Sequence, residues 1–324
     1  MKARVLGVLA MFVAVLAGSV SARSAEPHWP NALVIGTASP GGTYYAYGEG
    51  LARILTRTLG IRVSMRPTEG PNENITLLEN GEIQIGFITT GSGLQAWNGS
   101  GEWTQGRKFQ SMRVMFPMYD TPIHFLALEE SGIRSLADLT GKRVGVGPEG
   151  GTSGTYIPKF FETLGINATL SHGDWSSLAA QMEQRQLDTL AVASGVPFPA
   201  FAELGARNKV TYIPITREQI TALDLAMPEL EPSVIPPGSY PTLAGAYQTV
   251  GLYNLAVAHE SLPNDLVYAI IKAVFAFHDE MMTAHPAAAS TIPVNFTRNT
   301  FLPFHGGAVR YYQEIGVSGV AISD

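Results

Sequence analysis

The sequence predicts an α/β protein of two lobes, each a largely parallel sheet flanked by helices, and three observations support this. The same order of strand-like and helix-like segments occurs in both halves of the chain. In each half a glycine- and hydroxyl-rich turn follows a strand and opens a helix, at residues 39–45 and 147–155. The 324 residues also exceed what one hydrophobic core usually fills.

The first half predicts a β-α-β-α-β unit. Apolar residues at helical or alternating spacing give strands at 33–35, 61–65 and 83–88 and a helix at 44–54. A short helix begins near Pro71 and ends at Gly81, positions that proline and glycine favour. Such connections are right-handed and build a parallel sheet.

The second half repeats this plan. Strands are expected at 123–128, 143–146, 168–171 and 189–193, and helices at 152–164 and 176–185. Ser135 and Asp138 resemble a capping box. Pro158 should shorten or kink the first of the two helices, since proline removes an intrahelical hydrogen bond.

The last part predicts how the lobes are connected. Residues 211–249 are rich in proline and indicate an ordered connecting arm, followed by a strand at 250–258 and one helix at 263–284. The chain should cross between lobes near 118–121 and 246–251, which gives two hinge strands. The predicted domains are therefore 31–119 with 250–324 as one lobe and 120–249 as the other.

The N-terminus is typical of a secretory signal. Lys2 and Arg4 precede an apolar run at 5–17 and small residues at 18–22, so residues 1–22 are the predicted signal peptide. The alternative, a retained anchor helix, requires a longer apolar run. Because the chain has no cysteine, a lipid-modified cysteine and a disulfide are excluded. We expect a free monomer in a bacterial periplasm.

Composition and motifs exclude several functions. The net charge of −6 argues against nucleic acid as a partner. The seven histidines form no close metal-ligand pattern, and the chain has neither a Gly-x-Ser-x-Gly elbow nor a P-loop lysine. His172 and Asp174 are best explained as a solvated turn. We therefore expect no enzyme, no cofactor and no metal.

The two glycine-rich turns indicate an anion site. A helix that begins after glycines leaves backbone N–H groups free at its positive dipole end. Thr37, Thr43 and Tyr44 would add hydroxyls beside the Gly41–Gly42 turn, and hydroxyls at 152–155 would do so in the second lobe. Turn geometry alone is the alternative for each glycine taken singly. Two such turns on opposed lobes favour a carboxylate clamp.

Nearly the whole chain after the signal resembles one known family. The matching segments are 35–45, 77–87, 131–144, 147–152, 235–241, 285–288 and 303–312, among them Gly41-Gly42-Thr43-Tyr44-Tyr45 and Pro303-Phe304-His305-Gly306-Gly307. Their order and spacing resemble the TAXI family of solute-binding proteins that serve TRAP transporters. The resemblance implies a type II-like periplasmic-binding-protein clamshell. It would capture a small organic acid (a dicarboxylate, keto acid or glutamate-like amino acid) and deliver it to the membrane subunits of a TRAP permease.

Two alternatives stay open: the binding protein of an ATP-driven importer, and a periplasmic enzyme on the same fold. The resemblance also places Asn74 near the cleft. Where many members carry Gln-Ser-Asp this chain has Thr89-Thr90-Gly91, which favours an acid without an amine. The predicted ligand-binding residues are Thr37, Gly42, Thr43, Tyr44, Asn74, Thr89, Thr90, Gly150, Gly151, Thr152, Ser153, Thr155, Val196 and Phe198.

Overall fold

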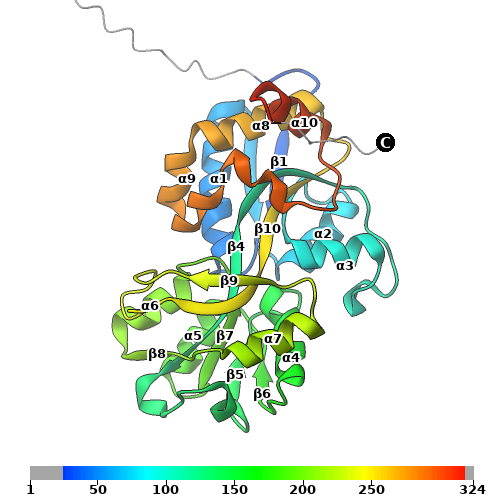
Figure 1. Ribbon diagram of the computed structural model, residues 1–324. Helices are drawn as coiled ribbons and strands as arrows, with labels where there is room; N and C mark the ends of the chain where they lie inside the picture. Colours follow the sequence, from blue (N-terminus) through cyan, green and yellow to red (C-terminus); the bar gives the residue numbers. More distant parts are fainter. Residues whose placement is uncertain (1–24, 318–324) are drawn as a thin grey trace, which may run out of the picture.

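Two lobes joined by two long strands make up the computed structural model, which describes residues 25–317 (Figure 1). The predicted signal peptide lies outside the described residues. In the first lobe β2, β1 and β3 are parallel, and β10 and β4 continue the sheet as antiparallel strands. Its elements are β1 (Ala32–Gly36), α1 (Thr43–Leu59), β2 (Arg62–Arg66), α2 (Pro71–Glu79), β3 (Ile85–Thr89), α3 (Thr90–Asn98), α8 (Asn264–Ala276), α9 (His278–Ala284) and α10 (Gly306–Glu314).

The second lobe has the same plan. Strand β5 pairs in parallel with β6 and β7, while β4 joins β7 as an antiparallel neighbour. Its elements are β5 (Arg143–Gly145), α4 (Thr152–Thr163), β6 (Thr169–Ser171), α5 (Trp175–Glu183), β7 (Thr189–Ala193), α6 (Pro199–Arg207), β8 (Val210–Tyr212), α7 (Arg217–Ala226) and β9 (Glu231–Ile235). The predicted α/β class with parallel-rich sheets is confirmed.

Both lobes share strands β4 (Met112–Leu128) and β10 (Tyr247–His259), which are hydrogen-bonded to each other where they cross (Figure 1). Asp120 lies opposite Tyr253 at this crossing. Two hydrophobic cores meet here, one ending at Tyr119 on β4 and the other starting at Ile123. The second core also includes Val250 and Leu252, and the first resumes at Tyr253, so on β10 the two cores meet between Leu252 and Tyr253. The division into 31–119 with 250–324 and 120–249 remains a proposal.

Three expectations about single elements were wrong. The helix expected at 263–284 is two helices, because Phe277 leaves helical geometry at φ −109° and ψ 32°. The arm at 211–249 contains helix α7, whose buried residue is Leu223 and whose apolar periodicity is therefore weak. Pro158 does not shorten α4, which continues to Thr163.

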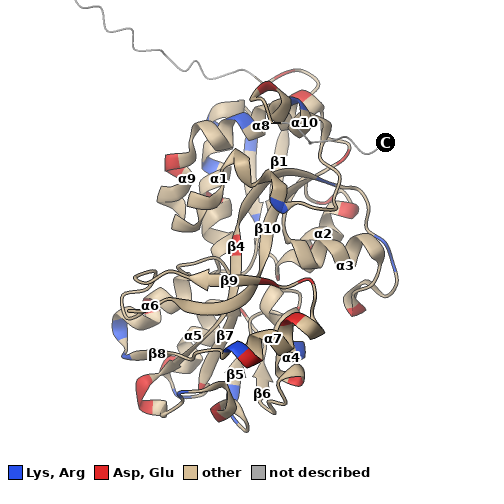
Figure 2. Ribbon diagram, in the orientation of Figure 1, with Lys and Arg blue, Asp and Glu red and all other residues tan. Residues whose placement is uncertain are grey.

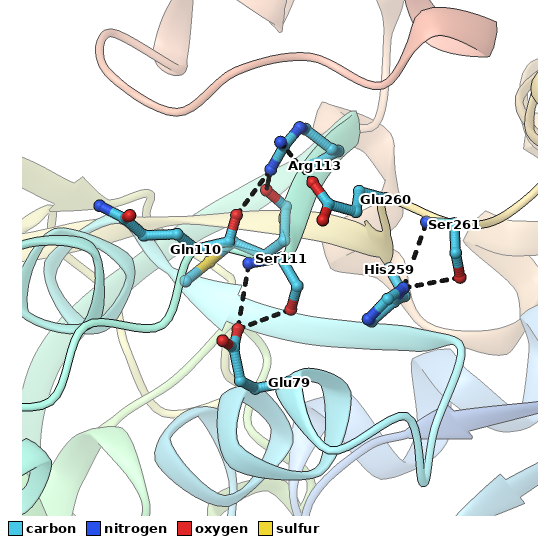
Figure 3. A network of polar contacts seen from close by, with 8 residues as sticks. Glu79, Gln110, Ser111, Arg113, His259, Glu260 and Ser261 are labelled. Atoms are coloured by element: carbon cyan, nitrogen blue, oxygen red, sulfur yellow. Dashed lines mark hydrogen bonds and ion pairs between the residues drawn. The ribbon is translucent and has the colours of Figure 1, made fainter.

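A network of polar contacts fixes α2 from its C-terminal end (Figure 3). Glu79 accepts hydrogen bonds from the backbone N–H of Ser111 at 3.0 Å and from its hydroxyl at 2.6 Å. Arg113 on β4 pairs with Glu260 just after β10, at 2.5 Å. Because α2 is held at this end, its N-terminal turn has a defined position at the junction of the lobes.

Candidate functional site

A cavity of about 40 Å³ lies between the lobes, with room for roughly three water molecules. The N-terminal turns of α1, α2, α4 and α5 surround it, together with the crossing of β4 and β10. Its lining residues are Ala38, Gly42, Thr43, Tyr44, Glu69, Gly70, Pro71, Tyr119, Thr121, Pro148, Gly151, Thr152, Ser153, Trp175, Ala193, Ser194, Gly195 and Asn254.

Helix α1 presents its N-terminus to the cavity because the preceding turn contains glycines. Gly41 has φ +82°, in the region that glycine adopts without strain. Gly42 is the N-cap residue, and no side chain caps the helix. The first N–H groups of a helix have no partner within it, so those of Thr43 and Tyr44 remain available to a ligand.

Helix α4 presents its N-terminus from the opposite lobe in the same way. Gly151 is its N-cap residue, again without a side-chain cap. Thr152 and Ser153 form its first turn and line the cavity. The Ser153 hydroxyl accepts the backbone N–H of Ala193 at 2.9 Å, which fixes the turn against strand β7.

The electrostatics of the cavity come from the backbone. Among the described residues that line it there is no lysine, arginine or histidine, and Glu69 is the one residue with a formal charge. Most of the charged residues lie instead on the helices and loops around the outside of both lobes (Figure 2). Each helix N-terminus contributes about half a positive charge. The site therefore suits a small anion held by N–H and O–H donors.

Three polar side chains form the wall at the strand crossing. The Tyr44 hydroxyl donates to Asn254 Oδ1 at 2.6 Å, and the Asn254 amide donates to the Tyr119 carbonyl at 2.7 Å and to Thr121. Tyr119 is 1% exposed, and its hydroxyl has no partner among the described residues. Burial raises the pKa of both tyrosines well above 10, so both remain protonated donors. The Tyr119 hydroxyl is thus a buried donor without a partner among the described residues, on a residue that lines the cavity.

The lobes are in direct contact around the cavity. Thr43 Oγ1 donates to the Gly195 carbonyl at 3.0 Å and lies 3.0 Å from the Ser194 hydroxyl. Across the other rim, the Asn72 amide donates to Thr155 Oγ1 at 3.0 Å, and the Gly150 N–H donates to Glu69 at 3.0 Å. The arrangement is a closed one.

The structure brings six of the predicted ligand residues to the cavity and leaves eight outside its lining. Those that line it are Gly42, Thr43, Tyr44, Gly151, Thr152 and Ser153. Those outside are Thr37, Asn74, Thr89, Thr90, Gly150, Thr155, Val196 and Phe198.

The polar groups outside the lining have partners within the protein. Thr37 donates to the Arg66 carbonyl at 3.1 Å. Asn74 donates to the carbonyls of Thr37 and Phe87 at 2.8 and 2.9 Å. Thr89 caps α3, so its side chain supports a helix and not the cavity. Residues 89–91 do not line the cavity, so they give no support to the prediction of an acid without an amine.

Two further predicted residues lie just beyond the cavity wall. The Thr90 hydroxyl accepts the Tyr253 N–H at 3.3 Å. Phe198 is fully buried, with its ring 4.9 Å from that of Trp175. It packs behind the wall, and Trp175 is the residue of this pair that lines the cavity.

Sequence reasoning missed Glu69, Tyr119, Trp175 and Asn254. Asn254 had a signal, since it is a polar residue inside the apolar run 250–258. Trp175 also had one, because Asp174 before it is a helix cap, with its carboxylate accepting the Ser177 N–H. Tyr119 had none, because an aromatic residue in a long apolar strand is indistinguishable from core.

Within the described residues, no cluster of three histidine or acidic side chains could hold a metal ion. None of the helices in the same part of the chain is long and apolar enough to span a bilayer.

Comparison with known proteins gives a family and a fold. Residues 35–316 match the sequence profile of the NMT1-like family. MatC of Rhodopseudomonas palustris, solved with bound malate, is 13% identical, with a TM-score of 0.59 over 89% of this chain and 97% of that one. PhnD1 of Prochlorococcus marinus, in complex with methylphosphonate, is 13% identical, with a TM-score of 0.52 over 89% and 99%. The fold is that of two-lobed periplasmic solute-binding proteins.

Proposed function

Since the chain belongs to the NMT1-like family, we propose that it is a periplasmic solute-binding protein that captures a small organic acid between its lobes. The observation that carries this proposal is the convergence of the α1 and α4 N-termini on a cavity lined by no cationic side chain. Free amides there are suited to a carboxylate. The malate in MatC and the methylphosphonate in PhnD1 are also small anions.

Binding would need no chemical step. A solute would enter between separated lobes, accept hydrogen bonds from the first turn of α1 and then meet the first turn of α4 as the lobes close. Closure removes water and so strengthens each hydrogen bond. The contacts of Thr43 with Ser194 and Gly195 would then hold the lobes together.

A screen of organic acids by thermal shift, followed by calorimetry, tests this proposal. A ligand at 100 times its Kd adds about 2.7 kcal/mol of stability, which is easily measured. We expect carboxylates to raise the Tm and their amides or methyl esters to leave it unchanged. If no carboxylate in a broad panel binds, the proposal is wrong.

We further propose that the closed protein delivers its solute to a TRAP permease. This rests on the TAXI resemblance of the segments at 35–45, 147–152 and 303–312. Co-reconstitution with its candidate TRAP permease should give uptake that follows an ion gradient. Uptake that requires ATP hydrolysis would instead identify an ATP-driven importer.

A further inference from the structure

Glu69 is the one charged residue in the described lining of the cavity. It precedes Gly70, the N-cap residue of α2. Its backbone N–H donates to the carboxylate of Glu73 at 2.7 Å, which fixes the loop. Its own carboxylate accepts the N–H of Gly150 on the other lobe at 3.0 Å. A negative charge is therefore held at the rim of the cavity.

The geometry around this contact is tight, and glycines make it possible. A Cβ on Gly150 would lie 2.8 Å from a carboxylate oxygen of Glu69. Gly70 has φ +134°, and a Cβ there would lie 3.0 Å from the Cα of Gly151. The Asn72 N–H also donates to the Gly150 carbonyl at 3.3 Å. The Glu69 carboxylate thus stays in place as long as the two turns touch.

The balance of charge in the cavity leaves room for one solute carboxylate. The N-termini of α1 and α4 together supply about one unit of positive charge. Those of α2 and α5 also lie at the cavity, but each is offset by a carboxylate of its own, Glu73 in the first turn of α2 and Asp174 at the N-cap of α5. One carboxylate on the solute matches the charge from α1 and α4, and the free hydroxyl of Tyr119 adds a donor. A second carboxylate would find no cationic side chain in the described lining, and it would be repelled by Glu69.

We propose that Glu69 restricts the bound solute to a single carboxylate and so makes the protein select small monocarboxylates against dicarboxylates of the same length. This rests on the proposed function above. The residue acts on specificity through charge, since its hydrogen bond to Gly150 would also form with an uncharged amide oxygen. The two acids of each pair compared have the same number of carbon atoms, and the nearly isosteric Glu69→Gln variant separates the effect of charge from the effect of the larger carboxylate group.

The test measures the Kd of matched acids by calorimetry for the wild type, Glu69→Gln and the control Glu203→Gln. The probes are propionate against malonate and butyrate against succinate. In the wild type the monocarboxylate of a pair should bind at least about tenfold more tightly than the dicarboxylate at low salt. Raising the salt should reduce the difference, because ions screen charges near a protein surface.

Glu69→Gln should reduce the preference by at least about fivefold, mainly through tighter dicarboxylate binding. Glu203→Gln removes the same charge from an exposed side chain of α6 outside the cavity lining and should leave the ratio unchanged. If the wild type binds the dicarboxylates as tightly as the monocarboxylates, or if Glu69→Gln leaves the ratio unchanged, the inference is overturned while the proposed function stands. If neither kind of acid binds, the proposed function itself fails.

Discussion

Replacing Tyr119 by phenylalanine should weaken solute binding without destabilising the empty protein. Tyr119 lines the cavity, and its hydroxyl is buried and has no partner among the described residues. A hydrogen bond to a carboxylate is worth about 1.5–3 kcal/mol. The Kd for a carboxylate solute should therefore rise roughly ten- to hundredfold.

The stability of the empty protein, in contrast, should not be reduced by Tyr119→Phe. Removing a buried hydroxyl that has no protein partner leaves no other group unsatisfied, so the Tm should stay the same or rise by about 2 °C. Tyr47→Phe is the matched control, because the Tyr47 hydroxyl bonds Thr291 Oγ1 at 3.0 Å away from the cavity. That variant should lower the Tm by about 2 °C and leave the Kd unchanged.

Calorimetry on the two variants and the wild type, with thermal unfolding of each in the absence of solute, measures both effects. An unchanged Kd for Tyr119→Phe would refute the assignment of its hydroxyl to the solute. A Tm that falls as far as that of Tyr47→Phe would show that the hydroxyl has a structural partner.

Three further changes have defined outcomes. Thr152→Ala should weaken the binding free energy measured by calorimetry by about 1–3 kcal/mol, which is roughly a five- to 150-fold rise in Kd, and an unchanged Kd would remove its hydroxyl from the site. Gly151→Ala should hinder closure of the lobes, because its methyl group would lie 3.0 Å from the backbone carbonyl oxygen of Glu69 on the other lobe. Small-angle scattering with solute should show a larger radius of gyration than for Gly245→Ala, whose added methyl group meets nothing within 4 Å. Burial lowers the pKa of His124, His285 and His305 to about 4. Because the unfolded chain therefore binds protons at a higher pH than the folded protein, the Tm should fall as the pH drops from about 6.5 towards 4. A Tm that is constant over this range would contradict the neutral state of these histidines.

The regular part of the fold was predictable because local patterns and packing agree there. The strand at 33–35 and the helix that begins near Tyr44 follow directly from apolar spacing, and both are present. Helix α7 was missed because it buries little of its surface and depends on the capping box of Thr216 and Gln219. The break at Phe277 involves no proline or glycine, so periodicity alone gave one continuous helix.

The candidate site was predictable only where backbone conformation determines it. The turns at Gly41–Gly42 and Gly150–Gly151 were found because glycines before a helix have a recognisable pattern. The remaining wall comes from Tyr119 and Asn254, which are brought together by the pairing of strands far apart in the sequence. Tyr44 contributes from a third element, and no local pattern connects the three.

The crossing of β4 and β10 has a mechanical consequence for transport. Asp120 and Tyr253 are paired there, so stretching or sliding one strand past the other would break backbone hydrogen bonds, whereas bending the ribbon would keep them. The lobes would then move relative to each other mainly by bending at this crossing, which changes the one angle between them. A membrane partner need sense only that angle to distinguish a loaded protein from an empty one. One permease surface could thus accept binding proteins whose clefts have diverged towards different solutes.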